Sequence, residues 1–298
     1  MLGLCNFLIS IPLKRKRKKL LEQLDFLCFD MNRFILIICI LASFPFPGFG
    51  QTNSKITIGK TLQLHSEILN ENRDLNIYVT EYFDSTKSSA VLYLLDGSLN
   101  EDFMHVAGLI QFFDMTFQIP QVIVVGIGNI DRKRDFTFAT SDEDLKKEFP
   151  SAGHSDLFIQ FIEKELQPFI GKQFNVNEQK MLIGQSLGGL LGTEILLKRP
   201  QLFTKYFITS PSLWWDNHSL LLQTEKYLIN ESSYTPDVYI AVGKEEDKIM
   251  IHDAKKFYKK IKNHSSIGNV EFNLMPNENH ATILHNSLYQ GFLTYLKK

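Results

Sequence analysis

From Lys55 to the end of the chain, short apolar runs alternate with segments of helical periodicity. The central runs are apolar at nearly every position, which is typical of parallel strands covered by helices on both faces. Eight strands are expected, in the segments KITIGKTLQLHS, LNIYVTEYF, AVLYLLDG, QVIVVGIG, QKMLIG, KYFITS, DVYIAVG and VEFNLM. The first two are expected to form an antiparallel edge. The chain is therefore predicted to be an α/β protein with a mostly parallel, doubly wound sheet and helices on both faces.

Helical periodicity follows most of these strands. It is expected over residues 102–113, 155–169, 187–197, 219–228, 249–261 and 281–296. No internal repeat or low-complexity linker interrupts the succession, so residues 51–298 are predicted to form a single domain. Ligands of such sheets bind beyond the carboxyl ends of the strands, and chemistry is expected in the loops that follow them.

The first fifty residues have a different character. After Met31, a short basic start at Arg33, an apolar run from Phe34 to Phe44 and small residues at Gly48 and Gly50 predict a secretory signal that is cleaved near Gly50. Met31 is the expected true start, since it opens a complete signal by itself. The alternatives are a membrane anchor, for which the run is too short, and a lipoprotein cysteine at Cys39, which bulky Ile38 disfavours. An exported protein, periplasmic or extracellular in a bacterium, is therefore expected, with no stable membrane span after signal removal.

Charge and cysteine content narrow the function of the remainder. Residues 1–50 hold 7 of the 32 Lys and Arg and 3 of the 33 Asp and Glu, so 25 basic and 30 acidic residues remain. A mildly acidic domain argues against nucleic-acid binding. All three cysteines lie in the same segment, so the predicted mature domain has no thiol, and covalent chemistry there must use oxygen or nitrogen.

The segment QKMLIGQSLGGLLGTEILL runs from a predicted strand directly into a predicted helix. Its residues 184–188 fit the pattern G-x-S-x-G, and this context predicts a nucleophile elbow with Ser186 exposed at the bend. Gly184 and Gly188 are expected to provide room where side chains would collide. The N–H of Leu187, in the first turn of the helix, is a candidate oxyanion donor.

A serine nucleophile needs a base and a group that orients the base. His280 lies in a polar loop directly after the last predicted strand, which is where such hydrolases place the histidine. The orienting acid is expected just after the strand that ends at Gly243, and Glu246 is preferred, with Asp247 as the alternative. A second oxyanion donor is expected at the N–H of Ser98, although an ordinary Asp-Gly turn is a competing interpretation.

With these positions in view, the chain resembles the esterases of the α/β-hydrolase superfamily. That group includes enterochelin-type siderophore esterases, esterase D-like enzymes, some feruloyl esterases and the mycolyltransferases. The resemblance rests on VLYLLDGSLNEDFMHVAG, VIVVGIGNIDRKRDFT, FIEKELQPFI, LIGQSLGGLLGTEIL, FITSPSLWWDN and ENHAT, within residues 90–285. It implies an α/β-hydrolase fold and a serine hydrolase with Ser186 as nucleophile, His280 as base, and Leu187 and Ser98 as oxyanion donors. It also matches Glu246, although some relatives resemble Ser-His dyads.

Six further residues are candidates for the substrate pocket. Arg132 and Arg134 either line it or hold their loop through a structural Arg–Asp pair. Trp214 and Trp215 either form an aromatic wall or pack against the domain. The last two candidates, Phe103 and His105, lie on the helix that follows Ser98.

The expected activity is carboxylic-ester hydrolysis through an acyl-enzyme. The substrate is expected to be a small-molecule ester, such as a siderophore-type or an acylated-sugar ester. An acyltransferase with the same triad, or a non-catalytic binding protein on this fold, are the alternatives. The predicted domain has neither a compact His/carboxylate spacing for a metal nor a glycine loop for phosphate, so no cofactor is expected. The sequence makes no prediction of oligomeric state.

Overall fold

The structure, a computed structural model, describes residues 17–25, 31, 33, 55–228 and 234–297. Its contacts divide the chain into two units, Met1–Ile56 and Thr57–Lys298. In the first unit residues 17–25 are helical, and most of the predicted signal, including residues 34–50, lies outside the described residues. No described helix is long and apolar enough to cross a bilayer.

The second unit is built on an eight-stranded sheet in the order β1-β2-β4-β3-β5-β6-β7-β8. The strands are β1 Lys60–Ser66, β2 Glu71–Val79, β3 Ser89–Leu94, β4 Val122–Ile127, β5 Val176–Gln185, β6 Lys205–Thr209, β7 Asp237–Gly243 and β8 Val270–Met275. Strand β1 pairs antiparallel with β2, and β2 antiparallel with β4, whereas the remaining pairs are parallel. Each of the eight predicted strand segments overlaps one of these strands, although β2, β3 and β5 begin before their predicted segments, and the predicted antiparallel edge is confirmed.

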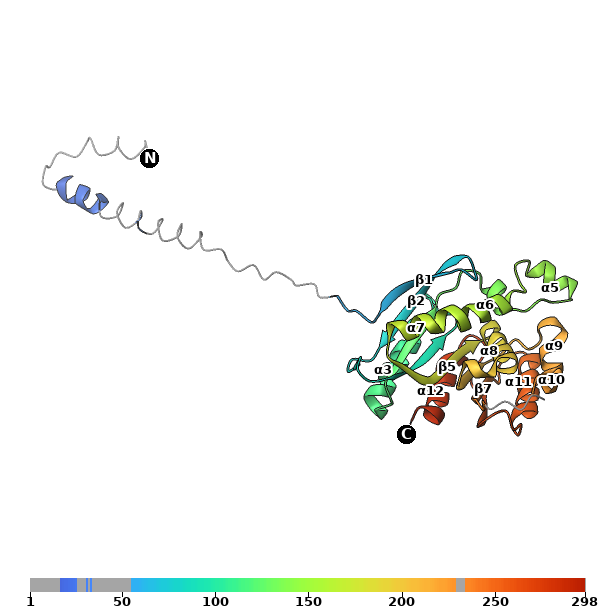
Figure 1. Cartoon of the computed structure of the whole chain (residues 1–298). Helices are drawn as coiled ribbons and strands as arrows, with labels where there is room; N and C mark the ends of the chain where they lie inside the picture. Colours follow the sequence, from blue (N-terminus) through green and yellow to red (C-terminus); the bar gives the residue numbers. More distant parts are fainter. Residues whose placement is uncertain (1–16, 26–30, 32, 34–54, 229–233, 298) are drawn as a thin grey trace. The chain divides into compact units, whose positions relative to one another are not determined.

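Helices cover both faces of this sheet (Figure 1). The helical segments are α3 Phe103–Phe117, α4 Arg132–Phe136, α5 Glu143–Glu148, α6 Ser155–Phe161, the π-helical η2 Ile162–Leu166, α7 Gln167–Gln173, α8 Leu187–Lys198, the 3₁₀ turn η3 Pro200–Leu202, α9 Trp215–Leu222, α10 Thr224–Leu228, α11 Lys248–Ile261 and α12 Ile283–Tyr295. The short helices α4 and α5 were not expected from the sequence. They lie between β4 and α6, in a stretch rich in turn-forming and charged residues, where apolar residues do not recur with helical spacing.

The core has two layers because the central strands bury both faces. Along β3, Val91 and Tyr93 belong to the apolar cluster that α6, α8 and α11 cover. Their neighbours Leu92 and Leu94 belong to the cluster under α3 and α12. Successive side chains of a strand point to opposite faces, so a strand buried on both faces must be apolar at every position. This explains the continuous apolar runs of the sequence.

The order of the strands creates the crevice in which a ligand can bind. Strand β3 lies between β4, which follows it in the chain, and β5, so the chain changes direction across the sheet at this point. The loops after β3 and β5 therefore diverge, which leaves a crevice at the carboxyl ends of these strands. Ser186 directly follows β5 and lies at this position.

Candidate active site

Ser186 occupies a strained bend between β5 and α8. Its backbone angles are φ 60° and ψ −119°, a conformation that costs a non-glycine residue about 1–3 kcal/mol. A Cβ atom at Gly184 would lie 2.2 Å from the carbonyl oxygen of Gly188, so only glycine fits there. At Gly188 itself an added Cβ would meet its nearest neighbour at 3.4 Å, so the second glycine of the pattern is less constrained than expected.

Neighbouring backbone groups hold the bend in place. The N–H of Ser186 donates to Thr209 O (3.1 Å), and the N–H of Ser212 donates to Ser186 O (3.0 Å). The Ser186 hydroxyl lies 3.4 Å from that of Ser212. The N–H of Leu187 lies in the first turn of α8, where a helix provides no acceptor for it. This amide proton and the positive end of the helix are therefore available to a developing anion beside Ser186.

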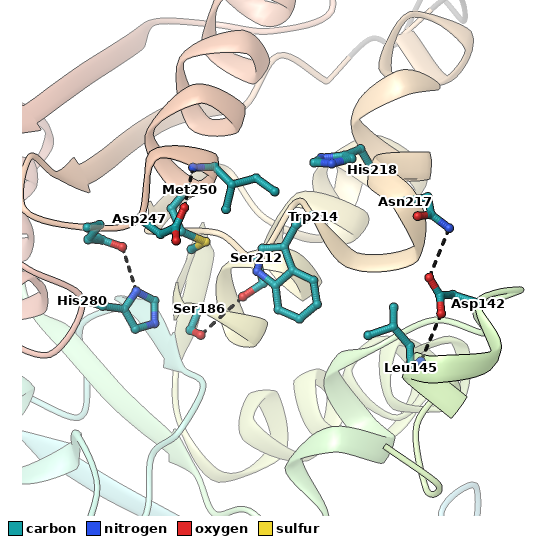
Figure 2. Close-up of a pocket in the computed structure, with 12 residues that line it drawn as sticks. Asp142, Leu145, Ser186, Ser212, Trp214, Asn217, His218, Asp247, Met250 and His280 are labelled. Atoms are coloured by element: carbon teal, nitrogen blue, oxygen red, sulfur yellow. Dashed lines mark hydrogen bonds and ion pairs between the residues drawn. The ribbon is translucent and has the colours of Figure 1, made fainter. Parts of the chain in front are cut away.

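The Ser186 side chain lines a pocket of about 670 Å³, which suits a small organic ligand. Figure 2 shows Ser186 and His280 at the same end of this pocket, with Ser212 and Trp214 beyond Ser186. The lining residues are Asp142, Leu145, Ser186, Ser212, Trp214, Asn217, His218, Glu246, Asp247, Ile249, Met250 and His280.

His280 contacts the carboxylate that was preferred from the sequence. Its Nδ1 atom lies 2.8 Å from Oε2 of Glu246, whose side chain is completely buried. A carboxylate only accepts hydrogen bonds, so Nδ1 carries a proton and Nε2 is left for a second partner. The side-chain amide of Gln185 donates to the His280 carbonyl oxygen at 2.5 Å and links the histidine loop to the bend of Ser186.

The surroundings of Glu246 keep this carboxylate ionised. Its Oε1 atom accepts hydrogen bonds from the Ser210 hydroxyl (2.5 Å) and the Gly243 N–H (2.7 Å). Burial alone would raise the pKa of Glu246, but the hydrogen bonds from His280, Ser210 and Gly243 outweigh it, so the pKa is lowered. A buried carboxylate that remains charged is suited to orient an imidazole and to stabilise its protonated form.

Asp247, the alternative acid, has another task. Its side chain accepts from the Ile249 N–H at 2.9 Å and so caps the N-terminus of α11. It lines the pocket, but its neighbour Glu246 is the residue in contact with His280.

The loop after β7 meets the loop after β8 through a close backbone contact. A Cβ atom at Gly243 would lie 2.2 Å from the carbonyl oxygen of Glu278, so the approach requires glycine. The N–H of Glu245 donates to the same carbonyl at 3.0 Å. This contact positions Glu246 and His280 relative to each other.

The structure differs from the sequence-based expectation at Ser98. The N–H of Ser98 donates to the Glu101 carboxylate at 3.1 Å, and Ser98 lines a different cavity from that of Ser186. The Glu101 carboxylate accepts the hydrogen bond of this amide, and its negative charge would repel an oxyanion. The expectation of Ser98 as the second oxyanion donor is therefore wrong for this arrangement, because the side chain of Glu101 folds back onto the turn.

Each of the two arginines is held in structural ion pairs with carboxylates, which is the alternative that the sequence left open. The Arg132 guanidinium binds both oxygens of Asp96, at 2.6 and 2.9 Å, and lies 3.3 Å from Gln185 O. Arg134 binds Glu71 and Asp135. Neither arginine lines the pocket of Ser186. Arg132 nevertheless contacts the bend, because its guanidinium donates to the carbonyl oxygen of Gln185, the residue before Ser186.

The two candidates on α3 also lie outside the pocket. Phe103 is 2% exposed and packs in the core on the α3 side of the sheet. His105 lies against His285 of α12, with ring centroids 5.1 Å apart. Burial, with a smaller contribution from His285, lowers the pKa of His105 to about 4. Both expectations of pocket residues are wrong, because the inner face of α3 packs on the sheet instead of facing Ser186.

The adjacent tryptophans have different surroundings. Trp214 lines the pocket (Figure 2). Trp215 is fully buried, donates from its indole N–H to Phe138 O at 2.9 Å and packs edge-on against Phe149. One residue of the pair therefore forms the aromatic wall that the sequence suggested, and the other anchors it to the domain.

Several pocket residues were missed by the sequence analysis. Ser212 lies in the loop after β6, at the carboxyl edge of the sheet. Its place directly after a predicted strand was the feature of the sequence that could have indicated it. Asp142 is the N-cap of the unexpected helix α5 and Leu145 lies within it. His218 lies in a left-handed turn within α9 that no periodicity of the sequence indicates. Within the described part of the chain, no group of three His, Cys, Asp or Glu residues could hold a metal ion.

Comparison with known proteins identifies related esterases. The family model described as "Putative esterase" matches residues 66–287, which is most of the chain. The ferri-bacillibactin esterase BesA of Bacillus subtilis is 30% identical over 258 residues, covering 79% of this chain and 89% of that protein.

Two solved structures are similar in both fold and sequence. The BES protein from Bacillus cereus has a TM-score of 0.71 and 28% identity, covering 81% of this chain and 96% of that one. An IroE-like serine hydrolase from Shewanella oneidensis has a TM-score of 0.71 and 29% identity, covering 80% of each chain. The chain therefore has the α/β-hydrolase fold, belongs to this esterase family and is a carboxylic-ester hydrolase.

Proposed function

We propose that this esterase works through an acyl-enzyme on Ser186, with His280 as general base and acid and Glu246 as the orienting acid. The observation that carries the proposal is the 2.8 Å contact between His280 and buried Glu246, in the pocket that also contains the strained Ser186. A nucleophile on a strained bend, a base and a carboxylate that holds the base are the three parts of a serine-hydrolase triad.

The chemistry proceeds in two half-reactions. Nε2 of His280 takes the hydroxyl proton as Ser186 Oγ attacks the ester carbonyl carbon, and the Leu187 N–H stabilises the oxyanion that forms. The bond to the alcohol oxygen then breaks, and the alcohol leaves with the proton that His280 returns. Water repeats the sequence on the acyl-serine and releases the carboxylic acid. Glu246 stabilises the protonated imidazole in both halves.

A fluorophosphonate probe tests the nucleophile, because it reacts covalently with an activated serine. Wild-type protein should be labelled, and Ser186→Ala should not. The matched control is Ser212→Ala, which removes the neighbouring hydroxyl at 3.4 Å and should leave labelling of Ser186 intact. Equal labelling of wild type and Ser186→Ala would remove Ser186 from the mechanism.

The proposed substrate class is siderophore-type esters. Support comes from the relatives, one of which is named ferri-bacillibactin esterase. The pocket volume of about 670 Å³ and the Trp214 wall suit an aryl-bearing ester. A panel containing a catechol-bearing trilactone, a feruloyl sugar and p-nitrophenyl acetate tests this class. The trilactone should show the highest kcat/KM, and a preference for the feruloyl sugar would assign the enzyme to acylated sugars instead.

We also propose that the protein is exported and that residues 1–50 are removed. The support is the basic start, apolar run and small residues that follow Met31 in the sequence. Mass spectrometry of the exported protein should find an N-terminus near Gln51. An exported protein that still begins at Met1 or Met31 would contradict the proposal.

A further inference from the structure

The pocket contains a second imidazole held by a buried carboxylate, which the mechanism above does not use. The Nδ1 atom of His218 lies 2.8 Å from Oδ2 of Asp253. The Asp253 side chain is 2% exposed, whereas that of His218 is 35% exposed and lines the pocket of Ser186. Figure 2 shows His218 across the pocket from His280, with Trp214 between them.

The fold holds His218 in place from several sides. Asp216, Asn217 and His218 all have a left-handed backbone, with φ between 49° and 61°. Side chains from other elements keep this unfavourable turn in place. Asp216 accepts from the hydroxyl of Thr140 at 2.8 Å, and the Asn217 amide donates to Asp142, the N-cap of α5, at 3.3 Å.

The contact with Asp253 fixes which ring nitrogen of His218 is free. A carboxylate only accepts, so Nδ1 of His218 donates to it, and Nε2 of the neutral ring keeps a lone pair. The other Asp253 oxygen lies 3.0 Å from Nδ1 of His252 on the outer side of α11. Nε2 of His218 is therefore the atom that can accept a hydrogen bond from a ligand.

The charge of the lining favours a neutral donor. The residues that line the pocket include the carboxylates of Asp142, Glu246 and Asp247 and no Lys or Arg. An anionic group in this pocket would meet three like charges, whereas a neutral hydroxyl would not. A phenolic hydroxyl on a ring packed against Trp214 would combine stacking with a hydrogen bond to His218.

We propose that His218, held by Asp253, is a specificity-determining residue that accepts a hydrogen bond from a phenolic hydroxyl of the substrate, in the part remote from the scissile ester. This inference rests on the proposed function, since it names the substrate group that the same pocket recognises. A site that hydrogen-bonds a substrate hydroxyl rejects the analogue that lacks it, because its own polar group is then left without a partner.

The test compares two matched esters, the ethyl esters of N-(2,3-dihydroxybenzoyl)serine and of N-benzoylserine, which differ only in the phenolic hydroxyls. The measured quantity is the ratio of their kcat/KM values. Wild type should prefer the hydroxylated ester. His218→Phe should lower the ratio about tenfold, because one hydrogen bond of ordinary strength is lost. Asp253→Asn should also lower it, since the ring loses the partner that fixes its tautomer.

The ratio does not depend on how much of a variant folds, because the same enzyme sample hydrolyses both esters. The control variant is His252→Gln, which removes the other imidazole on Asp253 and should keep the wild-type ratio. An unchanged ratio in His218→Phe would overturn the inference even if both rates fall. Wild-type protein that is not labelled by a fluorophosphonate and hydrolyses neither ester would instead overturn the proposed function.

Discussion

At the scale of single residues, the site depends on a carboxylate that remains ionised while fully buried. Three hydrogen-bond donors, from His280, Ser210 and the backbone of Gly243, compensate the cost of burying Glu246. Its neighbour Asp247 instead caps α11. The two adjacent acids therefore have different contacts, although both carry the same carboxylate group.

Replacing Glu246 and Asp247 in turn tests which of the two acids the reaction requires. Glu246→Gln should lower kcat/KM on p-nitrophenyl acetate by about 10²–10⁴, because an amide can favour the wrong imidazole tautomer and cannot stabilise the imidazolium. Asp247→Asn should stay within a few-fold of wild type, because an asparagine can still cap α11. Comparable activity of wild type and Glu246→Gln would favour a Ser-His dyad.

At the scale of secondary-structure elements, close backbone contacts position the loops of the candidate active site. The strand β5 turns into α8 with the backbone of Gly184 against that of Gly188, where no Cβ fits. In the same way Gly243 brings the loop after β7 against the loop after β8. These contacts explain why glycine is required at positions 184 and 243.

Adding one methyl group at Gly184, where it would meet the backbone of Gly188, tests whether glycine is required there. Gly184→Ala should lower the free energy of unfolding by at least about 1–3 kcal/mol and abolish fluorophosphonate labelling, because the clash is with backbone that cannot move aside. The control is Gly192→Ala, in the middle of α8, where an added Cβ would have its nearest neighbours at 3.8 Å. Urea denaturation measures both, and wild-type stability of Gly184→Ala would contradict the explanation.

The packing of α3 against α12 predicts a dependence of stability on pH. Burial and the nearby His285 lower the pKa of His105 from 6.5 to about 4. Between these values the unfolded chain binds more protons than the folded one, so His105 reduces stability as the pH falls from 6.5 towards 4. Asp102 lies 3.9 Å from His105 and is present in both wild type and His105→Leu, so a comparison of the two isolates the contribution of His105.

His105→Leu should remove this contribution. Its free energy of unfolding should fall less than that of wild type between pH 8 and pH 5, as measured by urea denaturation at both values. A variant that loses as much stability as wild type over this interval would show that His105 is protonated in the folded state.

At the scale of the whole molecule, the sheet gathers the site from distant parts of the sequence. Ser186 follows β5, Ser212 follows β6, Glu246 follows β7 and His280 follows β8, so all four lie at one edge. The wall opposite His280 comes from α5 and the turn at the start of α9. The described residues that line the pocket all lie within the unit Thr57–Lys298.

This unit should be sufficient for folding and activity. A chain of residues 55–298 should unfold in one transition at the same urea midpoint as the full chain and hydrolyse p-nitrophenyl acetate at the same rate. The physical reason is that all the described residues of both core clusters lie within this unit. A lower midpoint or a lost activity would show that earlier residues contribute to the fold or the site.

The sequence by itself determined the α/β class, all eight strands, and the position of Ser186, because these depend on local patterns of polarity and on steric requirements of a few consecutive residues. It also indicated His280 and Glu246 as residues that follow late strands. Only the tertiary structure separated Glu246 from Asp247, placed Trp215 in the core and Trp214 in the pocket, and turned the Ser98 amide towards Glu101. It also brought α5 and His218 to the site. The reason is physical: which way a loop side chain points depends on partners that are distant in sequence, and those partners meet only when the sheet has formed.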